Sequence, residues 1–200
     1  MKAQTLTQKL EQAIWIAHSL FQRNKTSGAT ANLSFLHEGH LYISGTGTCF
    51  GTLGTEDFSC LDLQGNHLSG VSPSKEYPLH LHFYRHNPTI RAVLHTHSFY
   101  ATLWSCYCKG NAASAIPSHT PYLAMRLGDI GLVPYAPPGS QELFSAFAAA
   151  LCEKKGYLLR NHGPVVGEGD LLAAFYGLEE LEESAQIAWA LRNEGMEELP

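Results

Sequence analysis

The stretch Val93-Leu94-His95-Thr96-His97 is the part of this chain around which the fold and its chemistry are arranged. It ends an apolar run that starts at Ile90, and such a run predicts a short buried strand. Residues two apart on a strand point to the same side, so His95 and His97 are expected to project together. Two imidazoles at that spacing can hold one divalent cation, and nitrogen ligands suit zinc. The stretch therefore predicts a metal site on a buried strand.

An open zinc site needs about three or four protein ligands, so the strand must recruit help from elsewhere. Glu76 is one outside ligand, because Ser72-Pro73-Ser74-Lys75 is a good helix start and a carboxylate in a first turn is favoured by the helix dipole. Dipole compensation alone is the commoner role for such a residue. His80 lies one turn later and can orient the carboxylate. His162 is the other outside ligand, since it follows an apolar strand and precedes Gly163-Pro164.

Hydrophobic periodicity and breakers predict the remaining elements and one domain over residues 1–200. A loop rich in breakers spans residues 116–122 and contains Tyr122, which either packs or takes part in chemistry. Asp170 is expected to cap the last helix, with Glu179, Glu180, Glu182 and Glu183 on its solvated side. The expected helices span 6–21, 72–86, 98–108 and 141–155, and the expected strands span 33–36, 40–44, 58–63, 90–94, 130–134 and 157–160.

Two small-residue loops, 26–34 and 44–51, carry many backbone and hydroxyl donors. Such loops can cradle an anion, and ordinary helix-to-strand connections have the same composition. Residues 44–51 do not form a P-loop, because no Gly-Lys-Ser/Thr ending is present.

Composition limits the possible functions. The 200 residues suffice for a real core, and a net charge of −5 gives no basic surface for nucleic acid. No run approaches the roughly 18 apolar residues of a membrane span, and the polar start lacks the apolar core of a signal peptide. Five cysteines at irregular spacing argue against a disulfide framework and favour a cytoplasmic location, while eleven histidines hint at metal or proton chemistry.

With these motifs in order, the chain resembles the class II aldolase/adducin family from about residue 6 to 192. The resemblance implies an α/β fold, an α/β/α three-layer sandwich around a mostly antiparallel central sheet. It also implies a homotetramer with active sites at subunit interfaces. The motifs that carry it are Ala31-Asn32-Leu33-Ser34, Thr46-Gly47, Ser72-Pro73-Ser74-Lys75-Glu76, His95-Thr96-His97, Pro121-Tyr122 and Asn161-His162-Gly163-Pro164.

The resemblance also implies roles for individual residues. Zn²⁺, or another divalent cation, would be held by His95, His97, His162 and Glu76. Glu76 would serve as the acid/base group when substrate displaces it, and Tyr122 would donate a proton, reaching a neighbouring subunit's site. The phosphate of the substrate would be held by Asn32, Thr46, Gly47 and Ser74. Ala31 stands where the family usually has glycine, and its methyl group restricts the loop backbone.

Within the family, the chain is most similar to members that decarboxylate 3-oxo-tetronate 4-phosphates. Lys75 stands where sugar-phosphate aldolases tend to have a second serine, and its ammonium can recognise a substrate carboxylate. The implied reaction yields dihydroxyacetone phosphate and carbon dioxide through a metal-stabilised enediolate. A sugar-phosphate aldolase of the L-fuculose-phosphate type, or an epimerase, passes through the same enediolate and remains an alternative. A metal-free, adducin-like scaffold is the remote alternative, and the complete set of histidines with Glu76 argues against it.

Overall fold

The computed structural model describes residues 4–108, 113–195 and 197–199, so the first three residues of the polar start lie outside it. No helix in this described part has the length and apolar character that crossing a membrane requires. The elements are α1 (Leu6–Gln22), β1 (Asn32–His37), β2 (His40–Ser44), the short 3-10 helix η1 (Thr55–Asp57), β3 (Phe58–Leu61), β4 (His67–Gly70), α2 (Tyr77–His86), β5 (Ala92–His95), α3 (Phe99–Tyr107), α4 (Pro121–Leu127), β6 (Ile130–Val133), α5 (Gln141–Ala150), β7 (Gly156–Leu159), β8 (Gly163–Glu168) and α6 (Leu171–Leu191).

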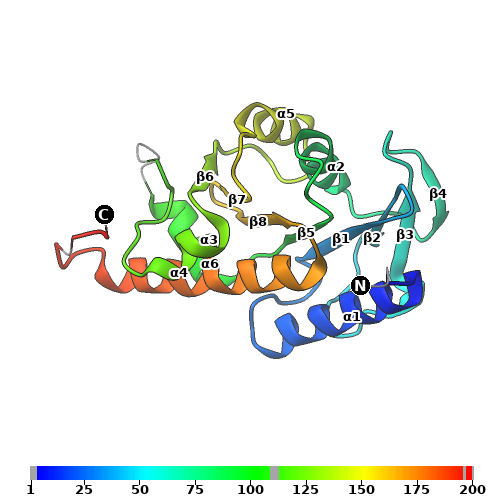
Figure 1. Ribbon diagram of the computed structural model, residues 1–200, viewed down its shortest axis with the longest axis horizontal. Helices are drawn as coiled ribbons and strands as arrows, with labels where there is room; N and C mark the ends of the chain where they lie inside the picture. The colour runs from blue at the N-terminus through cyan, green and yellow to red at the C-terminus, as the bar shows by residue number, and fades with distance from the viewer. Residues whose placement is uncertain (1–3, 109–112, 196, 200) are drawn as a thin grey trace.

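One eight-stranded sheet runs through the molecule in the order β4-β3-β2-β1-β5-β8-β7-β6. Every neighbouring pair is antiparallel except β6 with β7. The helices α1, α3, α4 and α6 lie on one side of the sheet, and α2 and α5 lie on the other (Figure 1). This arrangement confirms the α/β/α sandwich with a mostly antiparallel centre.

The central strands are apolar on both faces, which is why helices cover both sides. Leu94 and Val166 pack into the core beneath α6, whereas Val93 and Val165 pack into the core beneath α2 and α5. Successive strand residues point to opposite faces, so a doubly covered strand is apolar throughout. The same register sets Asn32 of β1 opposite His95 of β5.

Several element boundaries differ from the expectation. Strand β5 ends at His95, so His97 lies beyond it, and α2 begins at Tyr77 with Glu76 at its N-cap rather than in its first turn. The helix cannot start at Ser72, because Pro73 pairs with Gly45 and the Ser74 N–H donates to the Ser44 carbonyl. These hydrogen bonds hold Pro73 and Ser74 against the Ser44-Gly45 segment, and a turn at Lys75 and Glu76 then leads into the helix.

Three other elements also differ from the expectation: one helix is shorter, one helix replaces an expected loop, and one strand was not expected. Helix α5 ends at Ala150 rather than 155, because Leu151 is extended and the Cys152 N–H donates to the Tyr157 hydroxyl. Tyr122 lies in α4 rather than in a loop, since Pro121 is favourable as a first helical residue. Strand β4 is wholly exposed, so it gives no apolar pattern to read.

Glu182 is buried, and the prediction that it lies on the solvated side of the last helix is wrong. Its two carboxylate oxygens accept the backbone N–H groups of Tyr100 and Ala101, at 3.0 and 2.8 Å. These groups belong to the first turn of α3, where N–H donors lack helical partners. Glu182 therefore caps, from α6, the helix that follows His97.

Replacing Glu182 with alanine is expected to lower the free energy of unfolding by about 1–3 kcal/mol, since two buried N–H groups lose their acceptor. Urea unfolding of the metal-free protein measures this. Glu183→Ala is the matched control, because Glu183 lies next to it on α6 and is exposed. Equal unfolding free energies for the two variants would contradict the capping role.

Candidate active site

Three histidine side chains meet at one end of the central strands. His95 is the last residue of β5, His97 follows it, and His162 lies in the turn between β7 and β8. Ring centroids are 5.2 Å apart for His95 and His97, and 4.8 Å apart for His162 and each of the others. Their ligand nitrogen atoms all lie within 4.8 Å of one another. The structure therefore brings together the three histidines that the sequence singles out.

The turn that carries His162 depends on the glycine that follows it. A Cβ atom on Gly163 would lie 2.3 Å from the carbonyl oxygen of Thr96, which no side chain can tolerate. Asn161 adopts a left-handed conformation with φ of 56°, which asparagine accepts more readily than most residues. The Asn-His-Gly sequence thus lets the β7–β8 turn approach the His95-Thr96-His97 segment closely.

The hydrogen bonds of the site leave nitrogen lone pairs free for a cation. His95 Nδ1–H donates to the carbonyl oxygen of Pro164 at 2.8 Å, because a carbonyl can only accept. The lone pair of His95 is therefore on Nε2, the atom that faces the other histidines. The buried side-chain atoms without a hydrogen-bond partner include His95 Nε2, His97 Nε2, His162 Nε2 and Glu76 Oε1.

Glu76 lies against two of these nitrogens. Its Oε2 is 3.3 Å from His95 Nε2, and its Oε1 is 3.5 Å from His162 Nε2. In a tetrahedral zinc site with bonds of about 2.1 Å, two ligand atoms lie about 3.4 Å apart. These two distances between carboxylate oxygens and imidazole nitrogens match the spacing of ligands around one cation, and the donor set fits zinc.

Burial keeps these rings neutral, as metal ligands must be. It lowers the pKa of His95 to about 3, with a further contribution from His97. It also lowers the pKa of His162 to about 3 and lowers that of His97, against the opposing charge of Glu76. At neutral pH the three imidazoles therefore carry lone pairs without first losing a proton.

The loop that carries Thr46 and Gly47 lies beside the Ser72–Ser74 segment, and both are expected to supply phosphate-binding residues. The Thr46 N–H donates to the Ser72 carbonyl at 2.9 Å, next to the bridge between Gly45 and Pro73. Thr46 and Gly47 are exposed, and Gly47 has φ of 74°, which glycine adopts without strain. Ser74 is buried and its hydroxyl accepts the Glu76 N–H at 3.3 Å. Thr46, Gly47 and Ser74 are thus collected near the carboxylate.

Asn32 is the first residue of β1 and is hydrogen-bonded to the Glu76 carboxylate. Its Nδ2 donates to Glu76 Oε2 at 3.3 Å, and its Oδ1 lies 2.6 Å from Nε2 of His80. His80 therefore reaches Glu76 through Asn32 and not directly. The preceding residue, Ala31, is buried.

The buried hydrogen bonds also include Ser34 and Tyr84, to which the sequence gave no role. The Ser34 hydroxyl is 2.7 Å from both His80 Nδ1 and the Tyr84 hydroxyl. The signal was present, since Glu76, His80 and Tyr84 follow one another at the four-residue spacing of a helix face.

Lys75 and Tyr122 also lie outside the buried cluster. The Lys75 charge contributes to the lowered pKa values of His97 and His162, after burial. Its aliphatic stem passes over Gly139, where a Cβ atom would lie 3.0 Å from Lys75 Cδ. Tyr122 is 61% exposed, and no hydrogen bond among the described residues joins it to the histidines.

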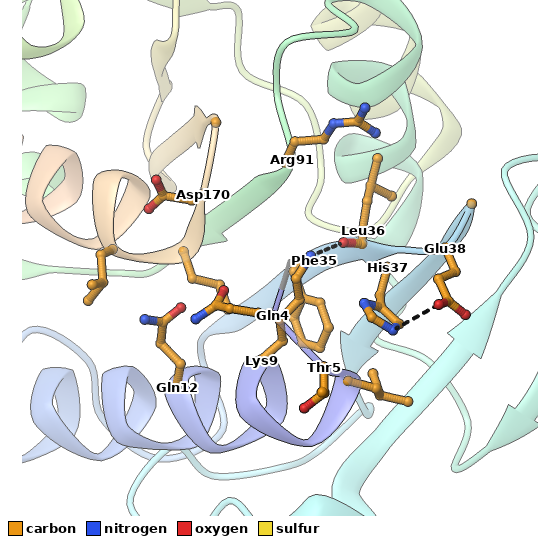
Figure 2. A pocket seen from close by; sticks show the side chains of 15 residues that line it. Gln4, Thr5, Lys9, Gln12, Phe35, Leu36, His37, Glu38, Arg91 and Asp170 are labelled. Carbon is orange, nitrogen blue, oxygen red and sulfur yellow. Dashed lines mark hydrogen bonds and ion pairs between the residues drawn. The ribbon is translucent and has the colours of Figure 1, made fainter. Parts of the chain in front are cut away.

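A cavity lies elsewhere in the molecule. It has a volume of about 950 Å³ and is bounded by the start of α1, the β1–β2 turn and the start of α6 (Figure 2). Its lining includes Lys9, His37, Arg91 and Asp170 but none of the predicted site residues. Because β1 runs from Asn32 to His37, the cavity is at the opposite end of that strand from the histidines.

Fold and site together define a class of protein, an α/β/α sandwich with three histidines and a carboxylate at the end of its central strands. The family model for the Class II Aldolase and Adducin N-terminal domain matches residues 11–189, so the chain belongs to this family. The family resemblance of the sequence motifs is thereby confirmed.

Two of the similar relatives have different assigned activities. The chain is 40% identical to a 3-oxo-tetronate 4-phosphate decarboxylase of Escherichia coli (strain K12), over 90% of this chain and 86% of the relative. It is 34% identical to an L-fuculose phosphate aldolase of Methanococcus maripaludis (strain C7), over 90% of this chain and 96% of the relative. The crystal structure of YgbL from Klebsiella pneumoniae, described as an aldolase/epimerase/decarboxylase, superposes with a TM-score of 0.94 at 39% identity, covering 99% and 96% of the two chains.

Proposed function

We propose that this protein decarboxylates a 3-oxo-tetronate 4-phosphate to dihydroxyacetone phosphate and carbon dioxide. The observation that carries the proposal is the cluster of His95, His97, His162 and Glu76, which among the described residues holds buried ligand atoms without hydrogen-bond partners and has carboxylate oxygens 3.3 and 3.5 Å from imidazole nitrogens. The 40% identity to a decarboxylase of that substrate supports the choice of reaction. We propose zinc as the cation, because the donors are three imidazole nitrogens and one carboxylate.

A bound divalent cation would supply Lewis-acid polarisation of the substrate carbonyl. The chain's own residues do the rest. The Thr46-Gly47 loop and Ser74 hold the phosphate, and the Lys75 ammonium holds the carboxylate that leaves as carbon dioxide. When the bond from C1 to C2 breaks, its electron pair moves toward the carbonyl at C3, and C2 must then receive a proton. Glu76 or Tyr122 delivers that proton as general acid.

The exposure of Tyr122 supports an oligomer in which it serves a neighbouring site. Tyr122 is 61% exposed at the start of α4, so its side chain is free to reach across an interface. We propose a homotetramer with interfacial active sites, as the family resemblance implies. Since one sheet spans the described elements, we also propose that residues 1–200 form one domain.

The direct test is to supply a 3-oxo-tetronate 4-phosphate to the zinc-loaded protein and measure carbon dioxide release. An L-fuculose-1-phosphate-type ketose is run alongside, with aldehyde release measured. Carbon dioxide without aldehyde establishes the decarboxylase. Aldehyde without carbon dioxide establishes the second candidate, a class II sugar-phosphate aldolase, which the 34% identity to an L-fuculose phosphate aldolase favours. An epimerised ketose with neither product would establish an epimerase instead.

Replacing Lys75 with serine is expected to separate the two kinds of substrate. Loss of a charge-assisted contact to a carboxylate costs about 1.5–3 kcal/mol, so kcat/KM for the sugar acid falls roughly 10–100-fold. Turnover of a neutral sugar phosphate, where measurable, changes little because it has no carboxylate at that position. Lys75→Arg is the matched control, since it keeps the charge. Equal losses on acid and neutral substrates would remove Lys75 from carboxylate recognition.

A further inference from the structure

A buried chain of hydrogen bonds leads from α2 and β1 to the carboxylate of Glu76. It runs from the Tyr84 hydroxyl to the Ser34 hydroxyl, to the His80 ring, to the Asn32 amide and to Glu76 Oε2. The exposed fractions are 0% for Ser34 and His80, 5% for Asn32 and Glu76, and 7% for Tyr84. The proposed function uses Glu76, and the family resemblance implies a role for Asn32, so Ser34, His80 and Tyr84 are left without a role.

The direction of each hydrogen bond follows from the carboxylate outward. A carboxylate only accepts, so the Asn32 Nδ2–H group must donate to it, and the Asn32 Oδ1 must then face His80. An amide oxygen only accepts, so His80 Nε2 carries a hydrogen and donates it. A neutral ring then has its lone pair on Nδ1, which accepts the Ser34 hydroxyl hydrogen, and Ser34 Oγ accepts from Tyr84. Every donor in the chain points toward Glu76.

These hydrogen-bond directions select one of the two flipped orientations of the Asn32 amide, whereas an isolated asparagine has no such preference. The two ends of an amide have nearly the same shape, and a flipped Asn32 would direct its oxygen at the carboxylate. A flipped amide would also set its NH₂ group against His80 Nε2–H, donor against donor. While the His80 hydrogen is on Nε2, only the orientation that gives Glu76 a hydrogen bond satisfies the network, and this orientation leaves Glu76 Oε1 free toward His162.

We propose that His80 is a positioning residue for Glu76, holding the Asn32 amide so that its NH₂ group faces the carboxylate, with Ser34 and Tyr84 holding the His80 ring in turn. The inference rests on the proposed catalytic role of Glu76. It reassigns Asn32 from a phosphate-holding residue to one that orients the acid/base group. Partners that orient metal ligands typically matter by 10–100-fold in metal affinity or activity.

Two substitutions at His80 separate positioning from packing. In His80→Gln the side-chain amide reaches the place of Nε2 and can still donate to Asn32. In His80→Asn the amide reaches only the place of Nδ1, so the Asn32 oxygen loses its donor. We expect kcat of His80→Asn to fall about 10–100-fold below that of His80→Gln, with KM changed by less than about 3-fold. Activity is measured as carbon dioxide or aldehyde release, whichever the wild-type protein performs, so a wrong substrate does not hide the result.

A spectroscopic readout is independent of turnover and of whether the variants fold. In the zinc-loaded wild-type protein labelled with ¹⁵N-histidine, the two-bond ¹H–¹⁵N spectrum should show His80 as the neutral ring with its hydrogen on Nε2. The signal missing in His80→Gln assigns it; if that variant does not fold, His80 is assigned from backbone-correlated spectra. A hydrogen on Nδ1, a charged ring, equal kcat in the two variants, or a loss confined to KM would each overturn the proposal. The last outcome would return Asn32 to phosphate binding.

Discussion

His95→Ala is expected to release the metal and abolish turnover. If about four ligands share a zinc-binding free energy of roughly 12 kcal/mol, losing one costs ~3 kcal/mol, which is a ~10²-fold weaker Kd. The substitution also removes one of the two hydrogen bonds to the buried Pro164 carbonyl, which keeps the Thr96 N–H at 3.4 Å, so this loss adds a stability cost of about 0.5–1.5 kcal/mol. The measurement is zinc content after competition with a chelator of known affinity, together with kcat at saturating substrate.

His86→Ala is the matched control, because His86 is an exposed histidine at the end of α2. It should retain the zinc and the activity of the wild-type protein. Thermal unfolding of both variants shows whether metal loss reflects a lost ligand or a lost fold. If folded His95→Ala competes for zinc as well as the wild-type protein does, His95 is not a ligand.

Glu76→Gln is expected to lower kcat by about 10²–10⁴-fold, the range that general acid/base groups contribute. The variant keeps three imidazole ligands, so it should still bind zinc, though more weakly. Its amide can no longer hold or release a proton, while its oxygen can still accept the Asn32 Nδ2–H group. Besides kcat, we would follow exchange of carbon-bound hydrogen of dihydroxyacetone phosphate with D₂O by NMR, which reports proton transfer without decarboxylation.

Glu11→Gln serves as the control for Glu76→Gln, since Glu11 is exposed on α1. It should leave both kcat and hydrogen exchange unchanged. If Glu76→Gln slows decarboxylation but exchanges hydrogen at the wild-type rate, another group such as Tyr122 delivers the proton. Full activity in Glu76→Gln would reduce Glu76 to a helix N-cap residue.

Local patterns were enough for much of this fold. The apolar run before His95 predicted β5, and the cap at Asp170 placed the start of α6 correctly, with its side chain accepting the Ala173 N–H. The predicted element boundaries were wrong where groups outside the element pair with its backbone. Pro73 belongs to a bridge with Gly45, and Cys152 is held by Tyr157, so neither the start of α2 nor the end of α5 could be read locally.

The candidate site, too, was predicted from the sequence only in part. Residue type and spacing singled out His95, His97, His162 and Glu76, because few side chains ligate metals and because such residues stand out beside an apolar strand or at a helix start. The sequence placed Glu182 in solvent because charged residues seldom lie inside proteins. Only the packing of α6 against the start of α3 reveals that this carboxylate has two backbone donors.

By itself, then, the sequence indicated the family and its sandwich fold through the resemblance of its motifs, and it singled out the candidate metal ligands, since both depend on residue identity and order along the chain. Tertiary structure alone decided the distances between Glu76 and the imidazole nitrogens. It also decided the chain of donors through His80 and Asn32, and the exposure of Tyr122. The physical reason is that each of these properties is set by strand register and helix packing between residues tens of positions apart, and spacing along the chain carries no record of those contacts.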